Sequence, residues 1–134
     1  MDETIAELRA LNEPVLKPLR LPTEHEIEQV EKELGVKFHP DYERYLLQAS
    51  DVVFGILEPA TIPSDSGHTY IVPLAKEAWA LGVPRDLVPI AEDNGDYYCM
   101  NKVGQVLFWS HNGATDEKWP DLAAWIRKVW ISVN

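Results

Sequence analysis

Cysteine is almost absent from this sequence: Cys99 is the single one among 134 residues, so no intramolecular disulfide can form. A chain without disulfides fits a reducing compartment. The sequence also lacks an apolar run near the roughly 20 residues that span a bilayer. The acidic N-terminus, MDETIAELRALNEP, has no apolar segment typical of a secretory signal. We therefore expect a cytoplasmic protein with no membrane partner.

Basic residues are also scarce: 12 Lys and Arg stand against 22 Asp and Glu, which gives a formal net charge of −10. Such a surface repels nucleic acid and attracts basic partners through its long-range field. The acidic excess therefore predicts no nucleic-acid partner. It leaves two readings open, a surface that keeps the protein soluble and a surface that binds a basic protein.

Signatures of catalysis are missing as well. Ser64–His68 contains the letters of a hydrolase triad, but triad members come from separate elements that meet in space. No nucleophile elbow, phosphate-binding loop or dinucleotide fingerprint occurs. The histidines lack metal-ligand spacing, and Glu92–Asp96 lacks the spacing of a calcium loop. We predict no catalytic residue, cofactor or metal. A remote alternative, a small hydrolase or metal-dependent enzyme, would need His68, His111 and a carboxylate to converge.

Helical patterns lie at both ends of the chain. A short helix is predicted over 2–12, before a proline-spaced linker. Thr23 and Glu26 match a capping box, and Gly35 suits the left-handed end of the helix they begin. A third helix is predicted from Pro40 to Ser50, a short one over 75–81, and a last one from about Pro120. The last helix has its apolar residues at Leu122, Trp125, Ile126, Val129 and Trp130.

Strand patterns lie between these helices. Leu87–His111 contains three apolar runs separated by two glycine turns, which predicts an antiparallel meander. Asn94-Gly95 fits a type I′ turn, and Gly104 fits the left-handed position of a three-residue loop. Further strands are expected over 52–57 and 69–72, and a polar loop over 112–118. The length and this order predict one α+β domain over 1–134, with a central antiparallel sheet of about four to six strands flanked by N-terminal helices and a C-terminal helix.

The first meander turn supplies the candidate binding residues. The type I′ turn places Asp93 opposite Asp96, and like charges that face each other across two strands are destabilising. Phe108 and Trp109 point to opposite faces of their strand. Either both are buried, or one is partly exposed beside the carboxylates, as is common in protein recognition. The candidate partner-binding residues are Glu92, Asp93, Asp96 and Trp109, whereas a small buried side chain is expected at Cys99.

Several ordered motifs also resemble a known family. They include Leu21-Pro22-Thr23 with Ile27, the helix start Pro40-Asp41-Tyr42, the run Leu87–Ala91, and the stretch Gly95–Met100 continuing through Gly104-Gln105-Val106 to Trp109-Ser110-His111. Over about residues 20–130 their order is similar to the SUKH superfamily of fungal cell-wall-assembly regulators and bacterial toxin-immunity proteins. Members often carry an Asn-Gly-Gly turn after the third helix, where this chain has Ser50-Asp51-Val52-Val53-Phe54-Gly55.

The resemblance implies a non-catalytic protein-binding domain. Bacterial relatives are commonly immunity proteins, so the implied partner is a cognate protein toxin, often one that acts on nucleic acid, or another basic protein. An acidic surface would steer association with a basic cleft. The alternative is a regulatory interaction module unrelated to toxins, as in the fungal relatives. The resemblance does not identify the contact residues.

Overall fold

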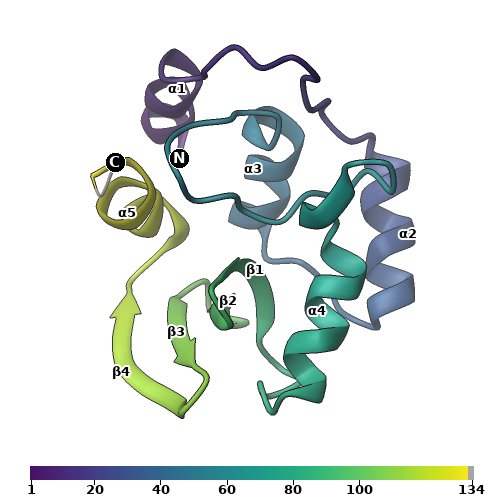
Figure 1. The fold of residues 1–134 in the computed structure, drawn as a ribbon, viewed down its shortest axis with the longest axis vertical. Coiled ribbons are helices and arrows are strands. Elements are labelled where there is room, and N and C mark those ends of the chain that lie inside the picture. The colour runs from purple at the N-terminus through teal and green to yellow at the C-terminus, as the bar shows by residue number, and fades with distance from the viewer. Residues whose placement is uncertain (133–134) are drawn as a thin grey trace.

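The computed structural model describes residues 1–132 and has an α+β architecture (Figure 1). Four strands form one antiparallel sheet in the order β1-β2-β3-β4, within the predicted range of four to six. The helices are α1 (Asp2–Ala10), α2 (Glu24–Leu34), α3 (Pro40–Ala49), α4 (Ile71–Ala80) and α5 (Leu122–Trp125). A 3-10 turn, η1 (Gly67–Thr69), precedes α4, and a π-helical segment, η2 (Ile126–Ile131), follows α5. The strands span Val88–Asp93, Asp96–Met100, Val106–Ser110 and Gly113–Trp119.

Local sequence signals set the helix ends as predicted. Thr23 accepts a hydrogen bond from the Glu26 N–H at 3.1 Å, and the Glu26 carboxylate accepts from the Thr23 N–H at 2.9 Å, which completes the capping box of α2. Gly35 ends this helix at φ 69°, a conformation that costs glycine little. Pro40 opens α3, where its missing N–H removes no helical bond.

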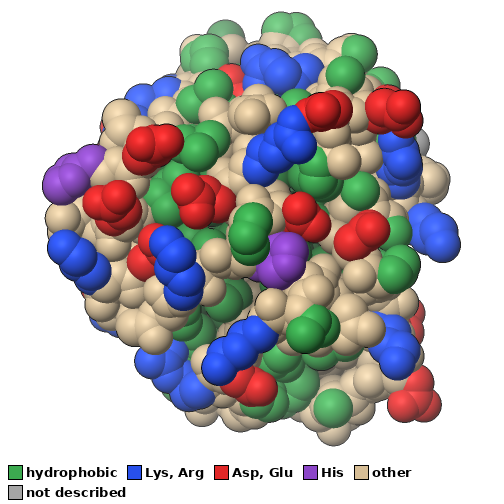
Figure 2. Space-filling view, turned by 180° about the vertical axis from the view of Figure 1, so that it is seen from behind, with side chains coloured by type: hydrophobic (Ala, Val, Ile, Leu, Met, Phe, Trp, Pro, Cys, Tyr) green, Lys and Arg blue, Asp and Glu red, His purple; other side chains and the backbone are tan. Residues whose placement is uncertain are grey.

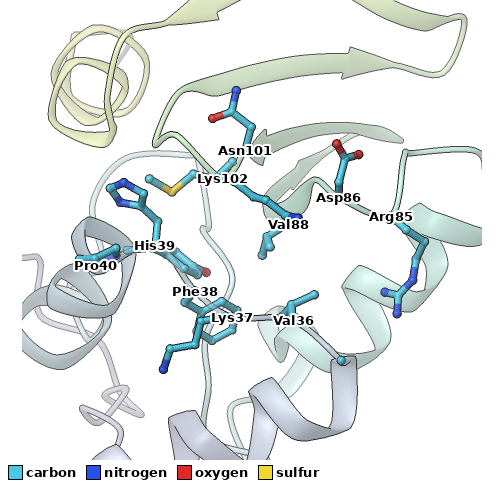
Figure 3. Close-up of a pocket in the computed structure, with 13 residues that line it drawn as sticks. Val36, Lys37, Phe38, His39, Pro40, Arg85, Asp86, Val88, Asn101 and Lys102 are labelled. Carbon is cyan, nitrogen blue, oxygen red and sulfur yellow. The ribbon is translucent and has the colours of Figure 1, made fainter.

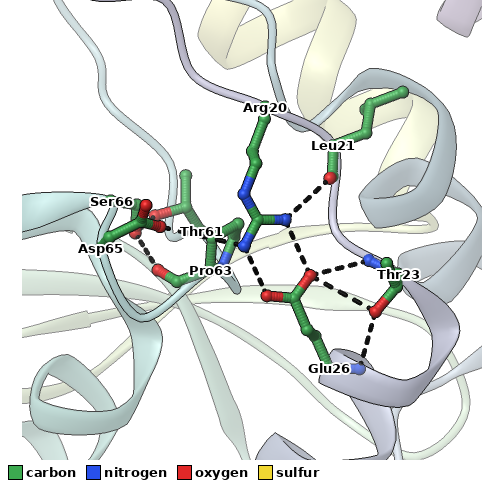
Figure 4. A network of polar contacts seen from close by, with 8 residues as sticks. All are labelled: Arg20, Leu21, Thr23, Glu26, Thr61, Pro63, Asp65 and Ser66. Atoms are coloured by element: carbon green, nitrogen blue, oxygen red, sulfur yellow. Dashed lines mark hydrogen bonds and ion pairs between the residues drawn. The ribbon is translucent and has the colours of Figure 1, made fainter.

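An ion-pair network extends the capping box and fixes the linker that precedes α2 (Figure 4). Arg20 donates to both carboxylate oxygens of Glu26, at 2.8 and 2.6 Å, and lies 3.9 Å from Asp65. The pairing with Arg20, followed by the bond from the Thr23 backbone, lowers the pKa of Glu26 to about 2. One arginine thus ties the linker to α2 and to the loop that contains Asp65.

The sheet lies between two helical layers (Figure 1). On one side α4 packs against β1. On the other, the Trp125 ring of α5 contacts the Tyr98 ring of β2, with centroids 5.4 Å apart. Trp125 and Trp130 are fully buried, and truncating such residues to alanine costs roughly 3–5 kcal/mol. The two ends of the chain meet: η2 contacts α1, and Arg127 donates to Glu7 at 2.8 Å.

The strand predicted over 52–57 is wrong. The backbone of Val53 bonds to the linker instead of to a strand, because it accepts from the Glu13 N–H and donates to the Asn12 side chain, both at 2.8 Å. Gly55 has φ 63°, which breaks an extended run. Val52 is buried in the main core, so an apolar residue is needed here although no strand forms.

Two other expectations were also wrong. Residues 69–72 form no strand, since Tyr70 makes only an isolated bridge to Thr61 and α4 begins at Ile71. Pro73 is tolerated there because it falls in the first helical turn. Residues 112–118 are no loop: Gly113–Trp119 form β4, the outer strand beside β3. Its middle residues are all exposed, so the alternation that marks a half-buried strand is missing from the sequence.

Candidate functional site

The β1–β2 hairpin has the turn predicted from Asn94-Gly95. Asn94 has φ 52° and Gly95 has φ 88°, both positive as a type I′ turn requires. In the register Asp93 lies directly opposite Asp96, so the two carboxylates do face each other across the pair. The exposed Glu92 accepts a hydrogen bond from the Gly95 N–H at 2.7 Å. This end of the sheet therefore carries all three acidic candidate residues.

Asp96 has a hydrogen-bond partner within the chain, His111. One of its oxygens accepts from the His111 backbone N–H at 2.8 Å and lies 2.9 Å from the His111 ring Nδ1. The His111 ring, then the His111 backbone, lowers the pKa of Asp96. The bond pins the start of β2 to the β3–β4 turn, so Asp96 supports the fold of this site.

The acidic side chains lie on both faces of the sheet. Burial, then the nearby carboxylates of Asp93, Glu117 and Asp96, raises the pKa of Tyr98. Burial, then Glu77 and Glu92, raises the pKa of Tyr97, which points to the opposite face. Asp93, Asp96 and Glu117 therefore lie on the Tyr98 face of the sheet, and Glu92 belongs to the other face.

The sequence does not point to Glu117, because its polar pattern predicts a loop over 112–118. In β4, Glu117 lies two residues before Trp119, whose ring is 5.8 Å from that of Tyr98. The two-residue period of a strand puts Glu117 on the Tyr98 face. We call Asp93, Asp96 and Glu117 the acidic cluster.

Trp109 lies away from this cluster. It pairs with Tyr97, is half-buried, and packs with the small core of Ala78, Val83, Tyr97 and Cys99. Phe108 points to the other face, where its ring is 4.9 Å from that of Tyr98. Both aromatics are thus partly covered on opposite faces, and Trp109 shares a face with Glu92 but not with the acidic cluster.

Cys99 and the histidines form no chemical centre. Cys99 is fully buried, and burial raises the pKa of its thiol to about 12, which disfavours the reactive thiolate. His68 pairs with Glu58, whereas His111 pairs with Asp96. Within residues 1–132, no group of three or more His, Cys, Asp or Glu could hold a metal ion. The convergence that a metalloenzyme needs is not found in this part of the chain.

A pocket of about 690 Å³ opens elsewhere, between the α2–α3 connection, the start of β1 and the end of β2 (Figure 3). Its lining includes Lys37, Arg85 and Lys102 but only one carboxylate, Asp86. Figure 2 shows the back of the molecule, where the surface is hollowed and basic side chains stand beside the hollow. Acidic and basic side chains are mixed over this face (Figure 2).

The chain is thus an α+β protein whose antiparallel sheet is packed between helices and carries the acidic cluster at one end. Comparison with known proteins places it in a family. The family model described as SMI1-KNR4 cell-wall, SUKH_5, matches residues 1–131, and the chain belongs to this family. The resemblance to the SUKH superfamily is confirmed.

A solved structure supports the same placement. A protein from Pseudomonas syringae pv. tomato with a known crystal structure shares 43% sequence identity with this chain. The match covers 98% of each chain, and the two structures superpose with a TM-score of 0.93. No curated protein matches the chain significantly. Family membership supports a non-catalytic domain with an immunity or regulatory role. In residues 1–132, no helix is long and apolar enough to cross a membrane.

Proposed function

We propose that this protein is a cytoplasmic immunity protein that binds a cognate, basic, nucleic-acid-acting toxin through its acidic sheet end. The observation that carries the proposal is the acidic cluster, in which three strands place Asp93, Asp96 and Glu117 on one face of the sheet. Family membership and the net charge of −10 support it. An acidic surface of this kind steers a basic partner and covers its cleft.

The cluster residues contribute differently to this proposal. Asp93 and Glu117 are exposed, and neither forms an ion pair with another described residue, so both are available to a partner's Lys or Arg. Asp96 is engaged by His111 and acts as a positioning residue. Glu92 would widen the contact on the other face of the hairpin. Trp109 would contribute to binding where a partner extends around the sheet end to that face.

Co-expression with the toxin encoded by the neighbouring gene tests the proposal. The intact protein should restore growth and form an isolable complex. The double variant Asp93→Asn/Glu117→Gln should associate more slowly and lose much of its salt dependence, since rim charges act mainly on the association rate. A matched variant, Glu24→Gln/Glu28→Gln on α2, removes the same charge elsewhere and should bind normally. Equal loss in both variants would show that net charge, not the acidic cluster, directs binding.

The alternative is a regulatory interaction module without a toxin partner, as in the fungal relatives. Gene context separates the two roles. A neighbouring toxin that the protein neutralises supports immunity. A solitary gene, with no rescue and no complex with any adjacent product, would overturn the immunity proposal and favour the regulatory one.

A further inference from the structure

The pocket beside the α2–α3 connection has the opposite charge character from the chain as a whole. Three cationic side chains line it, Lys37, Arg85 and Lys102, against the single carboxylate of Asp86. The chain has a net charge of −10, so this local excess of positive charge stands out. The volume of about 690 Å³ falls within the range of roughly 300–1,000 Å³ typical of small-ligand sites.

Some of the polar side chains here already have partners. Arg85 donates to the Leu34 carbonyl at 3.0 Å and stacks over the Trp79 ring at 3.8 Å. Lys37 lies 3.4 Å from Glu31. Arg85 and Lys37 therefore hold the walls of the pocket and contribute charge at its rim.

Other donors lining the pocket have no acceptor among the described residues. His39 Nδ1 accepts from the Asp41 N–H at 3.1 Å, so the neutral ring carries its proton on Nε2, for which no acceptor is found within residues 1–132. The exposed Lys102 ammonium likewise makes no ion pair in that part of the chain. The His39 ring and the Lys102 ammonium are therefore available to a ligand that supplies acceptors.

Apolar side chains complete the lining. Val36, Phe38, Val88 and Met100 contribute to it from three separate segments. Figure 3 shows residues 36–40 along one side of the open space, with Asn101 and Lys102 and then Val88, Asp86 and Arg85 around the rest. A ligand that fits needs an apolar body as well as acceptor atoms.

We propose that this pocket binds a carboxylate attached to a compact apolar body. The carboxylate would accept from Lys102 and His39 Nε2, while the apolar part packs against Phe38 and Val88. The site is separate from the acidic cluster and does not depend on the immunity role. Two sources supply this chemistry, a small organic acid and the free C-terminal carboxylate of a peptide.

Titration of the isotope-labelled full chain, followed by amide chemical shifts, tests the proposal with 3-phenylpropionate as the probe. Saturable shifts should centre on residues 36–42, 88 and 100–102. The neutral analogue 3-phenylpropionamide and the cation phenethylamine should bind more weakly. A short peptide ending in leucine, with a free or an amidated C-terminus, distinguishes the sources: binding of the free form alone assigns the pocket to a peptide end, and no peptide binding assigns it to a small acid.

Two variants sharpen the test. Lys102→Met should weaken 3-phenylpropionate up to about fivefold, the ratio that corresponds to one exposed ion pair. Lys118→Met, an exposed lysine on β4, is the matched control and should bind normally. Equal binding of acid and amide, shifts centred elsewhere, or an unchanged affinity in Lys102→Met would overturn the proposal.

Discussion

Asp93 lies directly opposite Asp96 in the β1–β2 register, yet the structure gives these two carboxylates unequal surroundings. Asp96 accepts from the His111 backbone N–H and lies against the His111 ring, at 2.8 and 2.9 Å. The exposed side chain of Asp93 accepts a hydrogen bond from the neighbouring Asn94 amide, at 3.3 Å. His111 thus stabilises the Asp96 carboxylate but not the Asp93 carboxylate that faces it.

Asp93→Asn should therefore stabilise the free protein slightly, by up to about 1 kcal/mol, because it removes like-charge repulsion across the strand pair. Chemical denaturation measures the gain, which should shrink at high salt as screening weakens the repulsion in the native protein. The same change should slow association with the toxin. A variant that alters neither stability nor binding would show that Asp93 is only solvated.

Asp96→Ala should destabilise the protein by about 1–2 kcal/mol, since it leaves the His111 backbone and ring without their shared acceptor. His111→Ala should cost less, because the backbone bond to Asp96 survives. A double-mutant cycle measured by denaturation isolates the side-chain coupling. Additive effects would mean that the ring contact contributes nothing. The lowered pKa of Asp96 gives the sign: this stability is present above its ordinary value of 3.8 and lost as pH falls.

Gly95→Val should destabilise the fold by roughly 1–3 kcal/mol through backbone strain. Gly95 has φ +88°, and no heavy atom lies within 4 Å of an added Cβ, so crowding plays no part. Gly95→Asn should cost much less because Asn tolerates this conformation. Thermal unfolding of both variants measures the difference. Equal stability of the valine variant and the natural protein would contradict the type I′ turn.

Gly104→Ala should cost about 1 kcal/mol or more beyond Gly113→Ala. Both glycines have positive φ, +93° and +111°, so both substitutions strain the backbone. An added Cβ at Gly104 would also lie 2.7 Å from His39 Nε2, whereas nothing lies within 4 Å at Gly113. Denaturation of the two variants in parallel separates crowding from strain. Equal costs would mean that the His39 ring moves aside freely.

Glu26→Gln should lower stability at neutral pH by up to about 1 kcal/mol, because glutamine can still cap α2 but cannot form the ion pair with Arg20. The pKa of Glu26 is lowered to about 2. The contribution of this carboxylate to the stability of the protein is therefore complete above the ordinary pKa of 4.5 and is lost as pH falls towards 2. Denaturation from pH 7 to about 3 should show the two proteins converging. Glu28→Gln, a matched change on the exposed face of α2, should show no such convergence.

The sequence by itself determined the parts that depend on neighbouring residues. The capping box of Thr23 and Glu26, the left-handed Gly35, the α3 start at Pro40 and the Asn94-Gly95 turn all follow from local hydrogen bonding and backbone preferences. The turn fixed the register, and the register placed Asp93 opposite Asp96. The family resemblance likewise rested on the order of such local motifs.

Only the tertiary structure decided the rest. β4 is an exposed outer strand paired with β3, and its polar sequence does not have the alternation of a half-buried strand. Val53 looks like a strand residue, yet its backbone bonds to Asn12 and Glu13, 40 residues or so earlier in the chain. Glu117 shares a face of the sheet with Asp93 and Asp96, and His111 supports Asp96, because the sheet brings separate segments together. Pairing partners distant in sequence leave no local signal, so both the acidic cluster and the cationic pocket emerge only from the fold.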